Sequence, residues 1–322
     1  MNLSDIKKTA VIGAGLIGSA WATGFSRAGY KVNLYDINPQ TLSAGLDKIR
    51  LNFALFADSG VMGNAQVEDA LARITLCDNL ENALEGVQFI QESVPDNLEL
   101  KKDVIKKIDN CNPAAILSSS ASWLKLSDIS ADSPYASRCV GGHPFNPPHL
   151  MPLVEITHWG KTDPKLVQTA YEFYLSIGKV PIILRKETLG FIANRLQAAY
   201  VREAIALVKE GICSVEDVDN ASVYGLGVRY AILGPYLNGE LNAPGGVGDY
   251  FGAAYGAGFS EGFKRLAECR ITSVPEDLPK LAAEGVEAQK ANRQKETGNT
   301  REEIIAHRDK LLIEILKLHN KW

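Results

Sequence analysis

A glycine-rich run near the N-terminus constrains the fold of this chain more than any other feature. The run Thr9-Ala-Val-Ile-Gly-Ala-Gly-Leu-Ile-Gly18 indicates a short apolar strand, a turn and the start of a helix. Its glycines have the spacing G-x-G-x-x-G, which suits a tight turn, close approach of the backbone to a pyrophosphate, and close packing of helix on strand. The helix N-terminus would present free N–H groups to the phosphates. The predicted phosphate-binding residues are Gly13, Gly15, Leu16, Ile17 and Gly18.

The residues after this run agree with a dinucleotide-binding unit. A helix with an apolar face is predicted to end at Gly29, and the segment Lys31–Asp36 predicts a second strand that ends in an acid. Asp36 lies eighteen residues after Gly18, near the spacing of a carboxylate that binds the adenosine ribose. A carboxylate there would repel a 2′-phosphate, and residues 37–40 include no Arg or Lys to hold one. The sequence therefore predicts NAD rather than NADP as cofactor.

Strand-like and helix-like segments alternate up to about residue 186, which predicts an α/β fold with a Rossmann-type doubly wound sheet. The expected strands are Thr9–Ile12, Val32–Tyr35, Phe89–Glu92, Ala115–Ser118, Cys139–Gly142, Leu153–Thr157 and Val180–Leu184. From Phe191 onward the patterns are helical, with Ser214 as an expected cap. We therefore expect an NAD-binding domain over residues 1–187 and an all-helical domain over residues 188–322, which would bind substrate.

Composition excludes several classes of function. The 322 residues carry a net charge of −4, whereas nonspecific nucleic-acid binding needs a basic surface. No apolar run is long enough for a membrane helix, and the first residues lack the layout of a signal peptide. The cysteines are odd in number and dispersed, which favours reduced thiols in a cytoplasmic protein and predicts no metal site. They are Cys77, Cys111, Cys139, Cys213 and Cys269.

A histidine and a glutamate are the best candidates for acid–base chemistry. His143 follows a strand-like run, at the end of the strand where ligands bind in α/β sheets. The proline-rich loop after it returns into an apolar strand that contains Glu155. A buried carboxylate beside an imidazole would fix its tautomer, so that His143 acts as base and Glu155 orients it. A structural histidine and a salt-bridged glutamate are equally compatible with the residues alone.

The motifs together resemble the 3-hydroxyacyl-CoA dehydrogenase family. Besides the glycine run they are Ser118-Ser-Ser-Ala-Ser122, Gly142-His-Pro-Phe-Asn-Pro147, Leu153-Val-Glu-Ile156 and Gly190-Phe-Ile-Ala-Asn-Arg-Leu196. The resemblance implies that His143 is the acid/base and that Glu155 pairs with it. It also implies that Ser122 and Asn194 hydrogen-bond the reacting oxygen, whereas the residues alone favour a turn or capping role for Ser122 and a capping or surface role for Asn194. It further implies a homodimer formed through the helical domain.

Two more cofactor-binding candidates flank the segment 93–100. Glu92 belongs to Phe89-Ile-Gln-Glu-Ser93, and Lys101 lies on the helix predicted after Val94-Pro95. In CoA-dependent members of the family, nearby positions line the cofactor cleft. For Lys101 a solvated helix face is an equally open interpretation.

The segment Tyr224–Pro235 resembles the branch of the family that contains L-gulonate 3-dehydrogenase, lambda-crystallin and L-carnitine dehydrogenase. Arg229 in this segment is a candidate for binding a free substrate carboxylate, because guanidinium binds carboxylate bidentately; a structural ion pair is the alternative. The apolar, slightly acidic segment Leu51–Gly60 weakens the case for CoA. The sequence predicts oxidation of the 3-hydroxyl of a small free L-3-hydroxy acid, with L-gulonate first and L-carnitine second. A 3-hydroxyacyl-CoA substrate, a crystallin-like structural role and an NAD-binding regulator stay open.

Overall fold

The computed structural model of the chain describes residues 1–268 and 271–321. It contains two compact units, which we describe separately. Unit 1 comprises Met1–Arg195 together with the residues from Leu312 onward, and unit 2 comprises Leu196–Leu311. The domain boundary expected at residue 187 stays a prediction. Cys269 lies outside the described residues, and the other four cysteines are free thiols.

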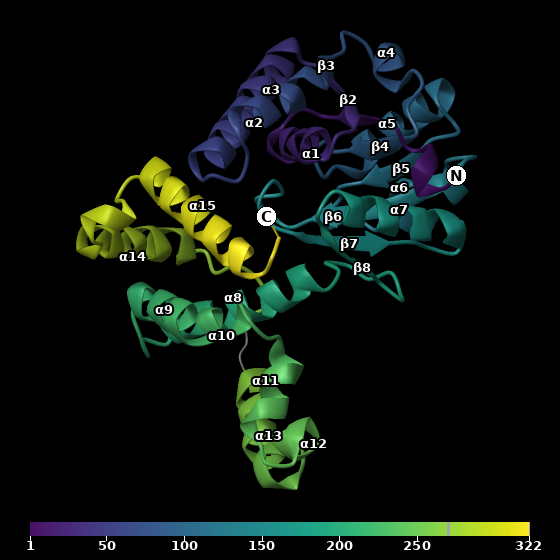
Figure 1. The fold of residues 1–322 in the computed structure, drawn as a ribbon. Helices are drawn as coiled ribbons and strands as arrows, with labels where there is room; N and C mark the ends of the chain where they lie inside the picture. Colours follow the sequence, from purple (N-terminus) through teal and green to yellow (C-terminus); the bar gives the residue numbers. More distant parts are fainter. Residues whose placement is uncertain (269–270, 322) are drawn as a thin grey trace. The chain divides into compact units, whose positions relative to one another are not determined.

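Unit 1 is built on one eight-stranded sheet with the strand order β3-β2-β1-β4-β5-β6-β7-β8 (Figure 1). The strands are β1 (Lys8–Ile12), β2 (Lys31–Tyr35), β3 (Ile74–Leu76), β4 (Phe89–Glu92), β5 (Ile116–Ser119), β6 (Cys139–Pro144), β7 (Leu153–Thr157) and β8 (Val180–Ile183). Neighbouring strands are parallel except β6 and β7. The expected doubly wound α/β sheet and helical C-terminal half are confirmed.

Two details of the sheet differ from the sequence prediction. Strand β3 is not among the predicted strands, because three residues at a sheet edge give little hydrophobic pattern. Strand β7 is antiparallel to β6, because the loop between them contains no helix that could carry the chain back across the sheet. This antiparallel pair places residues of β6 directly opposite residues of β7.

Helices cover both faces of the sheet, and an apolar cluster lies beneath each layer. The helices of unit 1 are α1 (Leu16–Arg27), α2 (Pro39–Asp58), α3 (Asn64–Ala72), α4 (Leu80–Leu84), α5 (Leu98–Cys111), α6 (Leu126–Ile129) and α7 (Pro164–Ser176), with short 3₁₀ segments at Leu3–Asp5 and Ala136–Arg138. On the α1 face, Trp21 and Phe25 pack with Phe89, Phe173 and Tyr174. These five aromatic side chains are completely buried, so they form the centre of the unit 1 core.

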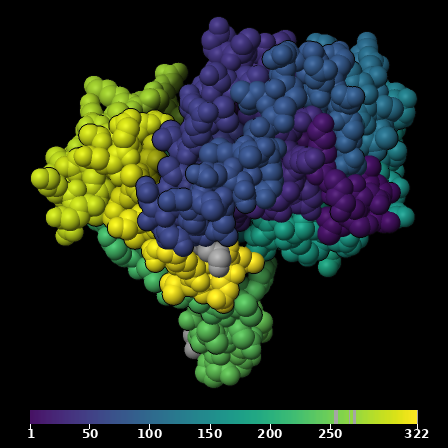
Figure 2. All heavy atoms as spheres, turned by 45° about the horizontal axis from the view of Figure 1, so that its top comes forward, coloured from purple at the N-terminus to yellow at the C-terminus, as the bar shows by residue number. Residues whose placement is uncertain are grey.

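Residues near the C-terminus complete this same core. Helix α15 (Arg301–Leu318) contributes the buried side chains of Ile313 and Leu316 to the apolar cluster on the α1 face. The Lys317 ammonium donates a hydrogen bond to the Ser59 carbonyl, 3.0 Å away at the end of α2. Figure 2 shows the yellow spheres of the C-terminal residues beside the blue-purple spheres of this part of α2. Unit 1 is therefore assembled from two segments far apart in the sequence.

Unit 2 is helical throughout its described residues. Its helices are the continuation of α8 (Ala193–Lys209), then α9 (Val215–Ala221), the π-helical η3 (Ser222–Gly227), α10 (Val228–Tyr230), α11 (Pro235–Asn242), α12 (Gly246–Phe251), α13 (Ala253–Glu268), α14 (Leu278–Asn292), the 3₁₀ segment η4 (Lys295–Thr297) and the start of α15. The expected cap is present, because the Ser214 hydroxyl accepts a hydrogen bond from the Asp217 amide at 3.1 Å. Within the described residues, no helix has the length and hydropathy to cross a membrane.

The third glycine of the run yields a test of the fold. A Cβ at Gly18 would lie 1.7 Å from the Gly13 carbonyl oxygen, so Gly18→Ala must move helix α1 away from the strand. We expect a loss of about 1–3 kcal/mol in the free energy of unfolding, the range for overpacking a core, and a weaker affinity for NADH. Thermal unfolding and NADH fluorescence titration measure the two effects.

Gly24 on the same helix supplies the matched control. A Cβ there meets nothing within 4 Å, so Gly24→Ala is expected to stabilise the helix by up to about 1 kcal/mol and leave NADH affinity unchanged. Equal stability of the two variants would contradict the close packing at Gly18.

Candidate active site

The glycine run forms a cradle of the kind a pyrophosphate needs. Gly13 has a φ of +99°, and a Cβ there would lie 2.7 Å from the Ser93 carbonyl oxygen, so only glycine fits between β1 and the residues after β4. Nothing lies within 4 Å of a Cβ position at Gly15, which is the N-cap of α1. The first turn of α1, with Leu16 and Ile17, thus faces open space with its amide groups free. The residues present fit a dinucleotide.

Asp36 lies immediately after β2, beside this cradle. One carboxylate oxygen accepts a hydrogen bond from the Ala14 amide at 2.8 Å, and the other accepts one from the Asn38 amide at 2.9 Å. The carboxylate is therefore held at the carboxyl end of β2, next to the glycine turn. This is the place where a ribose-binding acid belongs in the predicted unit.

His143 and Glu155 are opposite each other on the antiparallel strands β6 and β7. The His143 Nδ1 atom lies 2.9 Å from the Glu155 Oε2 atom, and the two residues are only 5% and 0% exposed. Because a carboxylate can only accept, Nδ1 is the nitrogen that carries the proton. Nε2 makes no hydrogen bond to any described residue, so it is the nitrogen left to exchange a proton.

The second oxygen of Glu155 binds the N-terminus of α8. Oε1 accepts hydrogen bonds from the amides of Ile192 and Ala193, at 2.8 and 3.0 Å. Burial alone would raise the pKa of Glu155, but the hydrogen bonds from His143, Ala193 and Ile192 together lower that pKa below its ordinary value. Glu155 therefore stays ionised and joins two elements of the site.

The Phe191 ring packs against the imidazole ring of His143. Its ring centre lies 5.1 Å from that of His143, and its φ of +51° is rare for a residue other than glycine. Gly190 before it also has a positive φ, and a Cβ there would meet the ring of Trp123 at 2.7 Å. The strained backbone turns the chain sharply, so that the amides of α8 face Glu155.

Ser122 and Asn194 are brought into direct contact. The Asn194 Nδ2 group donates hydrogen bonds to the Ser122 hydroxyl at 2.8 Å and to the Ser122 carbonyl at 3.2 Å. Asp96 fixes the backbone at the serine, because its Oδ2 accepts hydrogen bonds from the amides of Ser122 and Trp123 at 2.8 and 3.2 Å. Ser122, Asn194, Glu155 and His143 thus belong to one connected network.

Glu92 and Lys101 form a buried ion pair, with 2.8 Å between Oε1 and Nζ. Both are 0% exposed, so a solvated helix face for Lys101 is wrong. The ammonium also donates to the Val94 carbonyl at 3.0 Å and lies 3.5 Å from Asp96. The pair stabilises the turn between β4 and α5, and its predicted role in cofactor binding stays a prediction.

Sequence reasoning did not select Asp96 or Phe191 as site residues. The φ of Phe191 depends on tertiary packing and has no signature in the sequence. Asp96, directly before the α5 cap Asn97, has the short acidic side chain that commonly binds backbone amides, which is a weak signal for its role.

Arg229 lies on α10 in unit 2 and is exposed, and its predicted role in binding a carboxylate stays a prediction. Among residues 1–268 and 271–321, no cluster of His, Cys, Asp or Glu side chains is arranged to hold a metal ion.

Comparison with known proteins identifies the class. The family model described as 3-hydroxyacyl-CoA dehydrogenase, NAD binding domain, matches residues 8–188, and the C-terminal domain model of the same family matches residues 190–273. The chain therefore belongs to the 3-hydroxyacyl-CoA dehydrogenase family. It is an NAD-dependent dehydrogenase that acts on a hydroxyl group.

The chain is similar to individual members of known sequence or structure. Lambda-crystallin of Oryctolagus cuniculus is 38% identical over 83% of this chain and 82% of its own. L-carnitine dehydrogenase of Streptomyces griseus is 36% identical over 77% of this chain and 74% of its own. A solved structure of 5-formyl-3-hydroxy-2-methylpyridine 4-carboxylic acid 5-dehydrogenase matches with a TM-score of 0.77 and 25% identity, over 98% of this chain and 97% of that one.

The hydrogen bonds of Glu155 predict a stability that depends on pH. Because the pKa of Glu155 is lowered in the folded state, its carboxylate stabilises the fold above its unfolded pKa, and this contribution disappears as the pH falls. We expect Glu155→Gln to lower the free energy of unfolding by about 2 kcal/mol at pH 7. The difference from the unmodified chain should shrink below about pH 4. Denaturant unfolding at several pH values measures it.

Glu68→Gln, at an exposed position on α3, is the matched control and should leave stability unchanged at every pH measured. A Glu155→Gln penalty that persists undiminished at pH 3 would contradict the lowered pKa.

Proposed function

We propose that this chain uses NAD to oxidise the 3-hydroxyl of a small free L-3-hydroxy acid to a 3-oxo acid. The observation that supports it most is the pairing of His143 with Glu155, whose other oxygen binds the helix that bears Asn194. One carboxylate thereby orients both the predicted base and the predicted binder of the reacting oxygen.

The proton chemistry belongs to His143. The glycine run and Asp36 would hold NAD, which would supply the acceptor for the hydride from C3. His143 Nε2 removes the hydroxyl proton, because Nδ1 already donates its own proton to Glu155. The nearby carboxylate stabilises the imidazolium that results. Burial of the pair among Phe191 and the strands limits competing exchange with water.

Ser122 and Asn194 would bind the reacting oxygen. Their mutual hydrogen bond of 2.8 Å fixes both side chains before substrate arrives, and Asp96 fixes the serine backbone. Neutral donors held in place stabilise the partial charge that develops on the oxygen as hydride leaves. The Ser122 hydroxyl accepts from Asn194 and keeps its own proton, so its O–H is available as a donor for this contact.

The preferred substrate is L-gulonate, and Arg229 would bind its free carboxylate. L-Carnitine is the second candidate, favoured by the likeness to L-carnitine dehydrogenase. A 3-hydroxyacyl-CoA is the third, by the family's name. We also propose a cytoplasmic location and a homodimer formed through the helical domain, residues 188–322, whose exposed apolar side chains suit an interface. These include Tyr224, Ile232, Tyr236 and Leu241.

A substrate panel tests the proposal directly. NADH formation is followed at 340 nm with L-gulonate, L-carnitine, L-3-hydroxybutyrate and L-3-hydroxybutyryl-CoA at matched concentrations. Turnover of a free acid with little turnover of the thioester supports the proposal. Preference for the thioester, or bound NADH with no turnover of any of the four, contradicts it.

His143→Ala is expected to lower kcat by about 10²–10⁴-fold, the usual contribution of a general base, while NADH still binds. Steady-state rates and NADH titration separate the two properties. His158→Gln, on the loop after β7, serves as control and should keep normal turnover. Normal turnover in His143→Ala would remove His143 as the base.

Arg229→Ala is expected to raise the KM for a free acid by about tenfold or more, because one charge-assisted bidentate contact is lost. The KM for a CoA thioester should change little, since a thioester has no carboxylate at that place. Arg301→Ala, at an exposed arginine that begins α15, is the control. Equal effects of Arg229→Ala on both substrates would exclude a carboxylate contact.

A further inference from the structure

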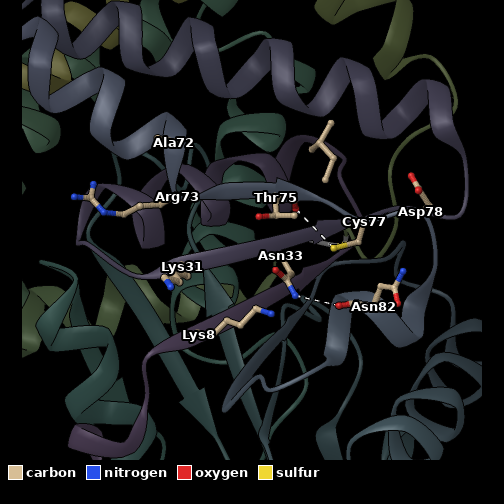
Figure 3. Close-up of a pocket in the computed structure, with 10 residues that line it drawn as sticks. Lys8, Lys31, Asn33, Ala72, Arg73, Thr75, Cys77, Asp78 and Asn82 are labelled. Carbon is tan, nitrogen blue, oxygen red and sulfur yellow. Dashed lines mark hydrogen bonds between the residues drawn. The ribbon is translucent and has the colours of Figure 1, made fainter.

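A polar hollow of about 490 Å³ lies in unit 1, over the sheet beside α4 (Figure 3). The hollow is lined by residues of β1, β2 and β3, by the residues on either side of β3, and by Asn82 of the five-residue helix α4. The volume is within the range of pockets that hold small molecules. None of the glycine-run residues, Asp36 or the residues around His143 lines it.

Cations gather at this hollow. Three of its ten lining residues are Lys or Arg, against 34 of 322 in a chain of net charge −4. Lys8 and Lys31 begin β1 and β2 and are partners in the register of these parallel strands. Arg73 precedes β3 at the rim, and Figure 3 shows its side chain extending away from Lys8. Lys8 and Lys31 are therefore direct neighbours across two paired strands.

The two lysines place like charges at paired positions of β1 and β2, and the carboxylate that lines the hollow, Asp78, lies beyond the carboxyl end of β3. Neighbouring strands lie about 4.8 Å apart, so the two lysines are adjacent at the amino-terminal ends of β1 and β2. The Lys8 ammonium donates to the Glu85 carbonyl at 2.9 Å, and neither lysine forms an ion pair with any described carboxylate. Like charges at paired positions destabilise a sheet. An anion with two or more negative charges would relieve this repulsion.

Uncharged polar groups line the rest of the hollow. Asn33 is 4% exposed, and its Nδ2 donates to the carbonyls of Asn82 and Ala83 at 3.2 and 2.9 Å. This leaves the carbonyl oxygen of the Asn33 side chain as an acceptor. The Thr75 hydroxyl and the Asn82 side chain lie around it (Figure 3). Such groups suit the hydroxyl groups of a ligand whose charged part meets the lysines.

We propose that this hollow binds a small, multiply charged anion, with Lys8 and Lys31 holding its phosphate or carboxylate groups. The charge of Asp78, at the carboxyl end of β3, disfavours an anion at that end of the hollow. The ligand's anionic part therefore lies over the first residues of β1 and β2. The site is separate from the residues that hold NAD.

Calorimetric titration of the full-length protein tests this proposal. The probes are inorganic phosphate and, separately, citrate, at low ionic strength and with saturating NADH so that the glycine run is already occupied. The test variant is Lys8→Gln/Lys31→Gln, and the control is Lys165→Gln, at an exposed lysine on α7. Protection of Lys8 and Lys31 from acetylation, followed by mass spectrometry, locates the bound probe.

We expect at least one probe to bind, with affinity about tenfold or more weaker in the double variant and unchanged in the control. Binding of phosphate alone identifies a phosphate-bearing ligand, and binding of citrate alone identifies a polycarboxylate. Unchanged affinity in the double variant overturns the proposal. So does the absence of binding of either probe at concentrations up to about 10 mM.

Discussion

The site of this dehydrogenase depends on the three hydrogen bonds of one carboxylate. Glu155 has no exposed surface, and an ionised carboxylate is stable there only if its oxygens are fully bound. One oxygen takes the Nδ1 proton of His143, and the other takes two amides of α8. The register of β6 and β7 and the sharp turn at Phe191 both serve this arrangement. The same interaction that orients the base also places Asn194.

A second buried carboxylate plays a comparable part at the neighbouring strands. Glu92 binds Lys101, the Val94 amide at 2.7 Å and the Ser119 hydroxyl at 2.5 Å. Lys101 in turn reaches Asp96, which holds the Ser122 backbone. Removing one member of such a pair would leave an unpaired buried charge, which is far more costly than the pair itself. The loops that bear the reacting residues are thus fixed by internal ion pairs.

Local patterns predicted most of this fold, because seven of the strands are apolar runs bounded by clear turns. Local patterns did not predict the features that depend on tertiary contacts or on connection length. β3 is short and at an edge, and the antiparallel direction of β7 follows from a loop too short for a crossover. In the site, the glycines, Asp36, His143 and Glu155 have recognisable spacing. The burial of Lys101, the φ of Phe191 and the contacts of Asp96 arise only when distant strands meet, so no local pattern could reveal them.

The return of the chain to unit 1 affects how that unit can form. Lys317 and Ser59, which are in contact, are 258 positions apart, and Ile313 and Leu316 fill the cluster beneath α1 and α2. During synthesis the first 195 residues therefore emerge with part of their apolar core uncovered, and stay so while all of unit 2 is made. Such a nascent intermediate exposes hydrophobic surface and depends on closing a very long loop, which makes its folding slow and open to aggregation.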